Sequence, residues 1–182
     1  IGQDHVTSIL RSAVKQNKIN HAYLFTGPRG TGKTSIARIL AYEINGLDYT
    51  DDTQQLDIIE IDAASNRRID DIRELREKVH IAPVSSAFKV YIIDEVHMLT
   101  TESLNALLKT LEEPPSHPFF ILATTEIQKL PATILSRVQR HNFRLIDAQM
   151  IADQLATIAH KEGMEISSEA LALLAEHGGG SF

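Results

Sequence analysis

The sequence predicts an α/β fold, in which a parallel sheet of five strands lies between layers of helices and is followed by the start of a small helical domain. Short apolar runs alternate with helical periodicity in the first part of the chain, which is the pattern of a parallel sheet covered on both faces. Beyond residue 146 only helical periodicity remains. We therefore expect one domain over residues 1–146 and a partial helical domain over residues 147–182.

The expected elements follow in chain order. The strands are the apolar runs 22–25, 57–61, 88–93, 119–123 and 141–145. Helices of the first domain are expected at 35–44, 69–79 and 104–111, where apolar residues recur every three or four positions. In the tail, a stripe from Ile151 to Ala159 predicts one helix, and Ser167–Ser168 predicts the cap of another that ends at Gly178–Gly180. This tail is too short for a core of its own and is expected either to lean on the first domain or to continue beyond residue 182.

Composition narrows the class of protein. Of the 182 residues, 43% are apolar and 23% charged, as in ordinary globular proteins. The net charge of −6 means that the surface as a whole does not attract nucleic acid, so any DNA contact must come from a local patch or from partners. The chain has no cysteine, which excludes disulfides and thiolate zinc sites. It has no apolar run long enough to cross a bilayer and no leader-like start, so we expect no membrane contact and a cytoplasmic location.

A phosphate-binding loop is predicted after the first strand. Residues 27–34 read GPRGTGKT, which fits G-x-x-x-x-G-K-[ST] between a strand and a helix. Glycines let backbone N–H groups turn toward phosphate oxygens, the helix start adds its dipole, Lys33 adds a charge and Thr34 offers a ligand to Mg²⁺. The alternative is a glycine-rich turn that binds nothing. The residues expected to hold ATP here are Gly27, Pro28, Arg29, Gly30, Thr31, Gly32, Lys33, Thr34 and Ser35.

Two carboxylates at the end of a later strand complete the expected chemistry. The run VYIIDE places Asp94 and Glu95 directly after apolar residues. Asp94 is expected to bind Mg²⁺ with Thr34, and Glu95 to act as general base on the attacking water. Alone, such a pair could be an ordinary strand-end turn. His97 completes a DEVH run typical of some helicases, but we interpret it as a plain surface or packing residue, and the histidines show no zinc-ligand spacing.

Long runs of the chain resemble one known family. They are HAYLFTGPRGTGKTSIAR, IIEIDAASNRRIDDIR, DEVHMLTTESLNALLKTLEEPP and ILATTEIQKLPATILSRVQR. Together they are similar to the ATPase core of the bacterial DNA polymerase III gamma/tau subunits, which are clamp-loader ATPases of the P-loop AAA+ class. The resemblance covers nearly the whole chain. It implies an AAA+ nucleotide-binding domain followed by a helical lid, with ATP and Mg²⁺ as cofactors.

The resemblance also implies roles for isolated residues. Thr125 matches the first sensor, which hydrogen-bonds the γ-phosphate or the attacking water; alternatively it is a strand-end threonine. Arg137 matches an arginine finger that acts in the neighbouring subunit's site, a task suited to its planar, permanently charged group; alternatively it is a solvated cation. Gly2 and Gln3 match the segment that packs near the adenine.

A DNA-facing set is implied in the same way. Clamp loaders form a spiral around duplex DNA, and such contacts would reach phosphates without reading sequence. The opposite interpretation is an ordinary solvated face, because Arg73 has Glu77 and Glu74 has Lys78 one turn away. The matching residues are Arg67, Arg68, Arg73, Lys109 and Lys129.

The chain also departs from the family pattern. A cysteine-free stretch at 45–55 stands where these proteins carry a four-cysteine zinc module. The chain begins at the adenine-side segment and ends just before the arginine that acts as the second sensor in the lid. We therefore expect weak ATP turnover from this chain in isolation.

The sequence as a whole predicts an ATP-hydrolysing motor subunit that, with other clamp-loader subunits, loads a sliding clamp onto primed DNA. Three alternatives stay open: a clamp-loader subunit that does not hydrolyse ATP, a binding module that nucleotide merely regulates, and an AAA+ helicase such as a branch-migration motor. Intact Lys33, Thr34, Asp94 and Glu95 argue against the first.

Overall fold

The computed structural model describes residues 1–49, 55–65 and 79–181. The described strands form a five-stranded sheet with the order β2-β3-β4-β1-β5. All four strand pairs are parallel. The strands are β1 Ala22–Thr26, β2 Ile58–Asp62, β3 Lys89–Asp94, β4 Pro118–Thr124 and β5 Gln139–Asn142. The predicted class of fold is confirmed.

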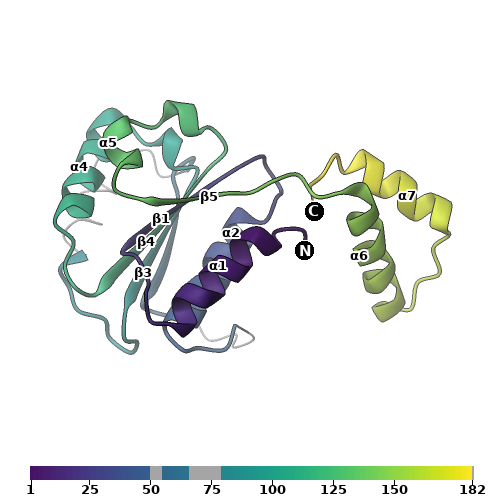
Figure 1. The fold of residues 1–182 in the computed structure, drawn as a ribbon, viewed down its shortest axis with the longest axis horizontal. Helices are drawn as coiled ribbons and strands as arrows, with labels where there is room; N and C mark the ends of the chain where they lie inside the picture. Colours follow the sequence, from purple (N-terminus) through teal and green to yellow (C-terminus); the bar gives the residue numbers. More distant parts are fainter. Residues whose placement is uncertain (50–54, 66–78, 182) are drawn as a thin grey trace.

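Helices cover both faces of this sheet (Figure 1). The helices are α1 Asp4–Lys15, α2 Lys33–Ile44, α4 Thr101–Glu112, α5 Ala132–Leu135, α6 Ala148–Lys161 and α7 Ser168–His177, with short 3₁₀ helices η1 Val96–Met98 and η2 Ile127–Lys129. Side chains alternate along each strand, so Phe25 packs with α1 and α2, whereas Leu24 packs with α4. The central strands β1, β3 and β4 are buried almost throughout, as expected of a parallel sheet covered on both faces.

Helices α6 and α7 stand apart from the sheet and pack on each other (Figure 1). Their small core contains Ile146, Ile151 and Ala175. The connection to the first domain includes a hydrogen bond from Ile146 N to Gly180 O at 3.0 Å. The side chains of Asp147 and Ser167 cap the two helices by accepting hydrogen bonds from Gln149 N and Ala170 N, respectively. None of the described helices combines the length and apolar character needed to span a membrane.

The last strand differs most from its expected bounds. The fifth strand is Gln139–Asn142, not 141–145, because β1 pairs with it only as far as Thr26 opposite Asn142. After a last bond from Phe143 N to Thr26 O at 2.7 Å, the chain turns toward the tail. Helix α1 was not predicted, although Val6 and Leu10 carry its buried stripe. The expected helix at 69–79 lies almost wholly outside the described residues.

Candidate nucleotide-binding site

The loop after β1 and the carboxyl ends of the neighbouring strands surround an open cleft of about 720 Å³. Parallel strands end at the same edge of the sheet, so residues far apart in the sequence meet there. The cleft is lined by Arg29, Gly30, Gly32, Lys33, Thr34, Ser35, Asp62, Ala64, Asp94, Glu95, His97, Met98 and Thr125. The structure thus brings the predicted loop, carboxylates and sensor threonine together. Asp62, Ala64, His97 and Met98 were not predicted.

The loop between β1 and α2 has the backbone shape that phosphate binding requires. Gly32, the N-cap of α2, has φ 90°, a left-handed conformation that side chains disfavour. At Gly27 a Cβ atom would lie 2.4 Å from the backbone oxygen of Phe143, the residue that follows β5, so only glycine fits there. Helix α2 then starts at Lys33 and directs its N-terminal N–H groups toward the cleft.

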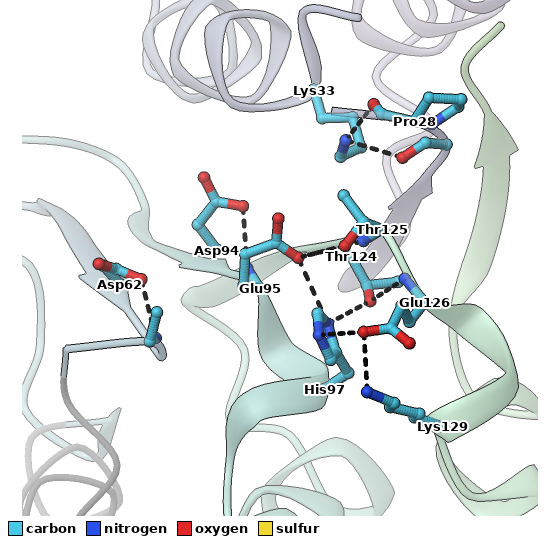
Figure 2. A network of polar contacts seen from close by, with 12 residues as sticks. Pro28, Lys33, Asp62, Asp94, Glu95, His97, Thr124, Thr125, Glu126 and Lys129 are labelled. Carbon is cyan, nitrogen blue, oxygen red and sulfur yellow. Dashed lines mark hydrogen bonds and ion pairs between the residues drawn. The ribbon is translucent and has the colours of Figure 1, made fainter. Parts of the chain in front are cut away.

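Lys33 sits inside this loop and is 6% exposed. Its Nζ donates hydrogen bonds to Gly27 O at 2.8 Å and Pro28 O at 2.7 Å (Figure 2). Burial lowers the pKa of Lys33, and the negative charges of Glu95 and Asp94 oppose that change. The ammonium is therefore held at the phosphate end of the loop, facing the carboxylates at the end of β3.

Thr34 and Asp94 form a pair suited to a magnesium ion. Thr34 Oγ1 donates to Asp94 Oδ2 at 2.6 Å, and the second oxygen, Oδ1, accepts from Glu95 N at 2.8 Å. Mg²⁺ prefers oxygen ligands and is commonly held by one carboxylate plus a hydroxyl and substrate phosphates. The donor set and its place beside Lys33 fit that ion.

Glu95 is fixed by its backbone and by two hydrogen-bond donors of Thr125. It has φ 46° and ψ 46°, a conformation uncommon outside glycine and often found at functional sites. Its Oε2 accepts hydrogen bonds from Thr125 N at 3.1 Å and Thr125 Oγ1 at 3.0 Å. The predicted general base, Glu95, and the predicted sensor, Thr125, are therefore directly hydrogen-bonded to each other.

His97 is a hub of polar contacts and not a plain surface or packing residue. Its side chain is 4% exposed. Its Nδ1 lies 2.9 Å from Thr124 Oγ1 and 3.3 Å from Glu95 Oε2, and its Nε2 lies 3.2 Å from Glu126 Oε1 (Figure 2). The one available signal was its position two residues after Glu95; its partners on the β4 end are a tertiary feature.

Glu126 carries the network to the surface. Its Oε1 also accepts from Lys129 Nζ at 2.8 Å, and the two side chains are 37% and 54% exposed. The hydrogen bond from Lys129 is the main reason that the pKa of Glu126 is lowered, with a smaller contribution from His97. Lys129, expected to face DNA, is thus connected to the cleft through Glu126 and His97.

Gln3 joins the loop to the start of the tail, and it does not line the cleft. It is 3% exposed, and its Nε2 donates to Thr31 O at 3.3 Å and Arg144 O at 2.7 Å. Gly2 lies against Ile146, since a Cβ there would be 3.1 Å from that side chain. Both residues therefore lie where the first domain meets the tail, and their adenine contact stays a prediction.

Arg137 is not among the residues that line the cleft. Its guanidinium binds Glu112 Oε1 at 2.7 Å, Thr133 O at 2.7 Å and Ser136 Oγ at 3.0 Å, and its side chain is 34% exposed. Of the expected DNA contacts, Lys109 is exposed on α4 and Lys129 pairs with Glu126. Arg67, Arg68 and Arg73 lie outside the described residues.

Comparison with known proteins adds family information. Residues 2–147 match the family model described as DNA polymerase III, delta subunit. The chain is 48% identical to the DNA polymerase III subunit tau of Bacillus subtilis, over 96% of this chain and 34% of that protein. It is 47% identical to the subunit tau of Escherichia coli, over 100% of this chain and 30% of that protein. It therefore spans about a third of the length of these relatives.

Solved structures agree on the fold. The Thermotoga maritima RuvB Holliday junction branch migration motor superposes with a TM-score of 0.77 at 20% identity, over 100% of this chain and 58% of that chain. At that identity the likeness shows the fold alone.

Proposed function

The chain belongs to the DNA polymerase III subunit family, with the tau subunits among its relatives, and we propose that it binds and hydrolyses ATP as a motor subunit of a clamp loader. The observation that carries this proposal is the meeting of Lys33 with Asp94 and Glu95 around one cleft. ATP and Mg²⁺ are the proposed cofactors. The proposed setting is bacterial DNA replication in the cytoplasm.

Binding begins at the loop of residues 27–34. Its backbone N–H groups and those at the start of α2 donate hydrogen bonds to the β- and γ-phosphates. Lys33 exchanges its hydrogen bonds to Gly27 O and Pro28 O for hydrogen bonds to phosphate oxygens. Its positive charge then neutralises phosphate charge that water would otherwise solvate. Thr34 and Asp94 would hold Mg²⁺, which would supply positive charge beside the phosphates when bound.

Glu95 prepares the attacking water. Its carboxylate accepts a proton as the water oxygen bonds to the γ-phosphorus, and the bond from that phosphorus to the bridging oxygen breaks to give ADP and phosphate. Thr125 holds one oxygen of Glu95 and can also orient the water or the γ-phosphate. Hydrolysis therefore depends on how Glu95 is shared between water and its protein neighbours.

Assembly completes the site in this proposal. Arg137, which does not line its own chain's cleft, is assigned by the family resemblance to the cleft of an adjacent subunit, where its charge would stabilise the transferring phosphoryl group. ATP favours the assembled state by binding it more tightly than the free one. The proposed partners are the other clamp-loader subunits, a sliding clamp and the phosphate backbone of primed DNA.

The test compares wild type with Glu95→Gln in the full-length subunit, assembled with its partners. The variant keeps the shape of the side chain but cannot accept the proton. We expect ATP binding close to that of wild type and loss of the hydrolysis that clamp and primed DNA stimulate. Normal clamp loading by Glu95→Gln would instead indicate a nucleotide-regulated binding module, and DNA strand displacement would indicate a helicase.

A further inference from the structure

We propose that Glu112 is a positioning residue for Arg137, which it holds in place while leaving part of the guanidinium open to the phosphates in a neighbouring subunit's cleft. This inference rests on the proposed function, in which Arg137 acts on an adjacent subunit, and it deepens that function by naming what prepares the arginine. Glu112 is the last residue of α4, and Arg137 lies between α5 and β5.

The two residues stand on elements that are packed against each other. Helices α4 and α5 are in contact on one face of the sheet (Figure 1). Leu111, which precedes Glu112, and Ile134 of α5 are almost fully buried in the same hydrophobic core. The backbone N of Arg137 donates to Ile134 O at 3.0 Å. This packing fixes both backbones independently of any partner, so the side chains alone decide where the guanidinium points.

The guanidinium of Arg137 is held through two of its nitrogens. Its Nη1 donates to Thr133 O at 2.7 Å and to Ser136 Oγ at 3.0 Å. Its Nη2 lies 2.7 Å from Glu112 Oε1. In the part of the chain that the structure describes, no residue accepts a hydrogen bond from Nε. A guanidinium carries five N–H donors, so Nε and the second N–H of Nη2 remain available.

Another ion pair in the chain shows the contrasting, closed arrangement. Arg38 donates to Glu60 through both Nε, at 2.7 Å, and the second nitrogen Nη2, at 2.6 Å, so one carboxylate fills the whole fork. At Arg137 the carboxylate of Glu112 meets Nη2 alone. A fork of two N–H groups is the geometry that binds two phosphate oxygens at once. Glu112 therefore orients Arg137 without closing that fork.

Helix stability does not account well for this contact. The C-terminal end of a helix carries partial negative charge, which makes a carboxylate at Glu112 unfavourable unless a cation lies close. Arg137 supplies the cation, but the two side chains are 41% and 34% exposed, and exposed ion pairs stabilise proteins little. What the contact does change is rotamer freedom, because a long arginine side chain loses much entropy when it is ordered. An arginine ordered in advance loses less of that entropy during catalysis.

The opposite interpretation is that Glu112 restrains Arg137 and keeps it from a neighbour's phosphates. In that case the loss of Glu112 would speed up hydrolysis, whereas the loss of a positioning residue slows it. The contacts of Nη1 and the open Nε favour positioning, because Arg137 can reach a phosphate through Nε while it keeps its bonds to Thr133 O and Ser136 Oγ.

The experiment measures the rate of ATP hydrolysis against ATP concentration, with the full-length subunit in its complex with partners, clamp and primed DNA. Glu112→Ala removes the oxygen that meets Nη2. We expect kcat to fall about fivefold, the upper end of what an exposed ion pair contributes, with an unchanged KM for ATP. Glu112→Gln keeps an acceptor oxygen and should restore most of the rate. The matched control is Glu113→Ala, since this neighbouring carboxylate is exposed and meets no polar partner among the described residues.

Mixed assemblies separate positioning from a loss of structure within one subunit. A subunit with both Glu95→Gln and Glu112→Ala has no working site of its own, so any loss beyond that of Glu95→Gln alone arises at a neighbour's cleft. We expect this further loss. Glu112→Ala should also not slow a protein that already carries Arg137→Ala, because Glu112 acts only through Arg137.

Two outcomes distinguish this inference from the proposed function on which it rests. If Arg137→Ala is slow but Glu112→Ala hydrolyses ATP at the wild-type rate or faster, the positioning role of Glu112 is overturned and the role of Arg137 stands. If Arg137→Ala hydrolyses ATP normally in the assembly, the proposed function of Arg137 fails, and the role of Glu112 fails with it.

Discussion

Replacing Lys33 by alanine should remove most of the affinity for ATP. The Nζ atom makes two hydrogen bonds to the loop, at 2.8 Å to Gly27 O and 2.7 Å to Pro28 O, so it can offer at least two to phosphate oxygens in their place. A hydrogen bond to a charged group is worth about 1.5 kcal/mol or more, so two give about 3 kcal/mol. That energy corresponds to a rise in the Kd of about 100-fold.

The assay is calorimetric titration of purified protein with a non-hydrolysable ATP analogue and Mg²⁺. Lys18→Ala is the control, because Lys18 is an exposed lysine between α1 and β1 and leaves the cleft intact. Melting temperatures without nucleotide show whether the variant is folded, since removal of the Lys33 cation also leaves Asp94 and Glu95 without its charge. A folded Lys33→Ala protein whose Kd rises less than about tenfold would refute the assignment of the loop.

Three further predictions concern other parts of the chain. Arg137→Ala should leave ATP binding unchanged but lower the rate of ATP hydrolysis in the assembly by about 10³-fold or more, as for other arginine fingers. Mixing the Arg137→Ala subunit with a Glu95→Gln subunit tests whether Arg137 acts in trans. A normal rate of hydrolysis in Arg137→Ala would contradict this role. Asp57→Asn should lower the free energy of unfolding by about 2 kcal/mol in urea titrations, because the buried carboxylate accepts bonds from Val84, Ser85 and Ser86. Burial favours the neutral form of Asp57, yet these donors lower its pKa to about 2. In wild type this stabilisation is therefore present above the pKa of the unfolded state and is lost as pH falls toward 2. If the free energy of unfolding of Asp57→Asn fell with pH in the same way as that of wild type, this reasoning would be contradicted. Changing Arg67, Arg68 and Lys109 together should weaken DNA binding and flatten its salt dependence, and an unaltered slope of log K against log salt would count against these contacts.

What could be predicted from the sequence was local. The loop at 27–34 and the carboxylates at the end of β3 are contiguous motifs, and the rule that parallel strands end at one edge brings them together. The same rule could have placed Asp62, which ends β2 at that edge. Helix α1 was missed even though its sequence has buried Val6 and Leu10 at helical spacing. The fifth strand was shifted because its end depends on pairing with β1, which its own composition does not encode.

The contacts of His97 could not be predicted from the sequence for a different reason. Its partners Thr124 and Glu126 come from the end of β4 and the turn that follows, so the contacts exist only once β3 and β4 are adjacent. A histidine two positions after a carboxylate is compatible with a surface turn as well as with a buried hub. Only the packed fold distinguishes the two.

The polar groups of the cleft form hydrogen bonds and ion pairs with one another. Lys33 binds loop carbonyls, Thr34 binds Asp94, and Glu95 binds Thr125 and His97. ATP and Mg²⁺ would therefore replace internal hydrogen bonds and not merely add contacts, so part of the gross binding energy goes into rearranging the ends of β3 and β4. A ligand shifts an equilibrium only by its difference in affinity for two states. Internal pairing of this kind supplies that difference, because each exchanged bond changes the partners of a neighbouring element. In the proposed clamp loader, the same exchange would link the phosphates to Glu95 at the end of β3 and to Thr125 after β4.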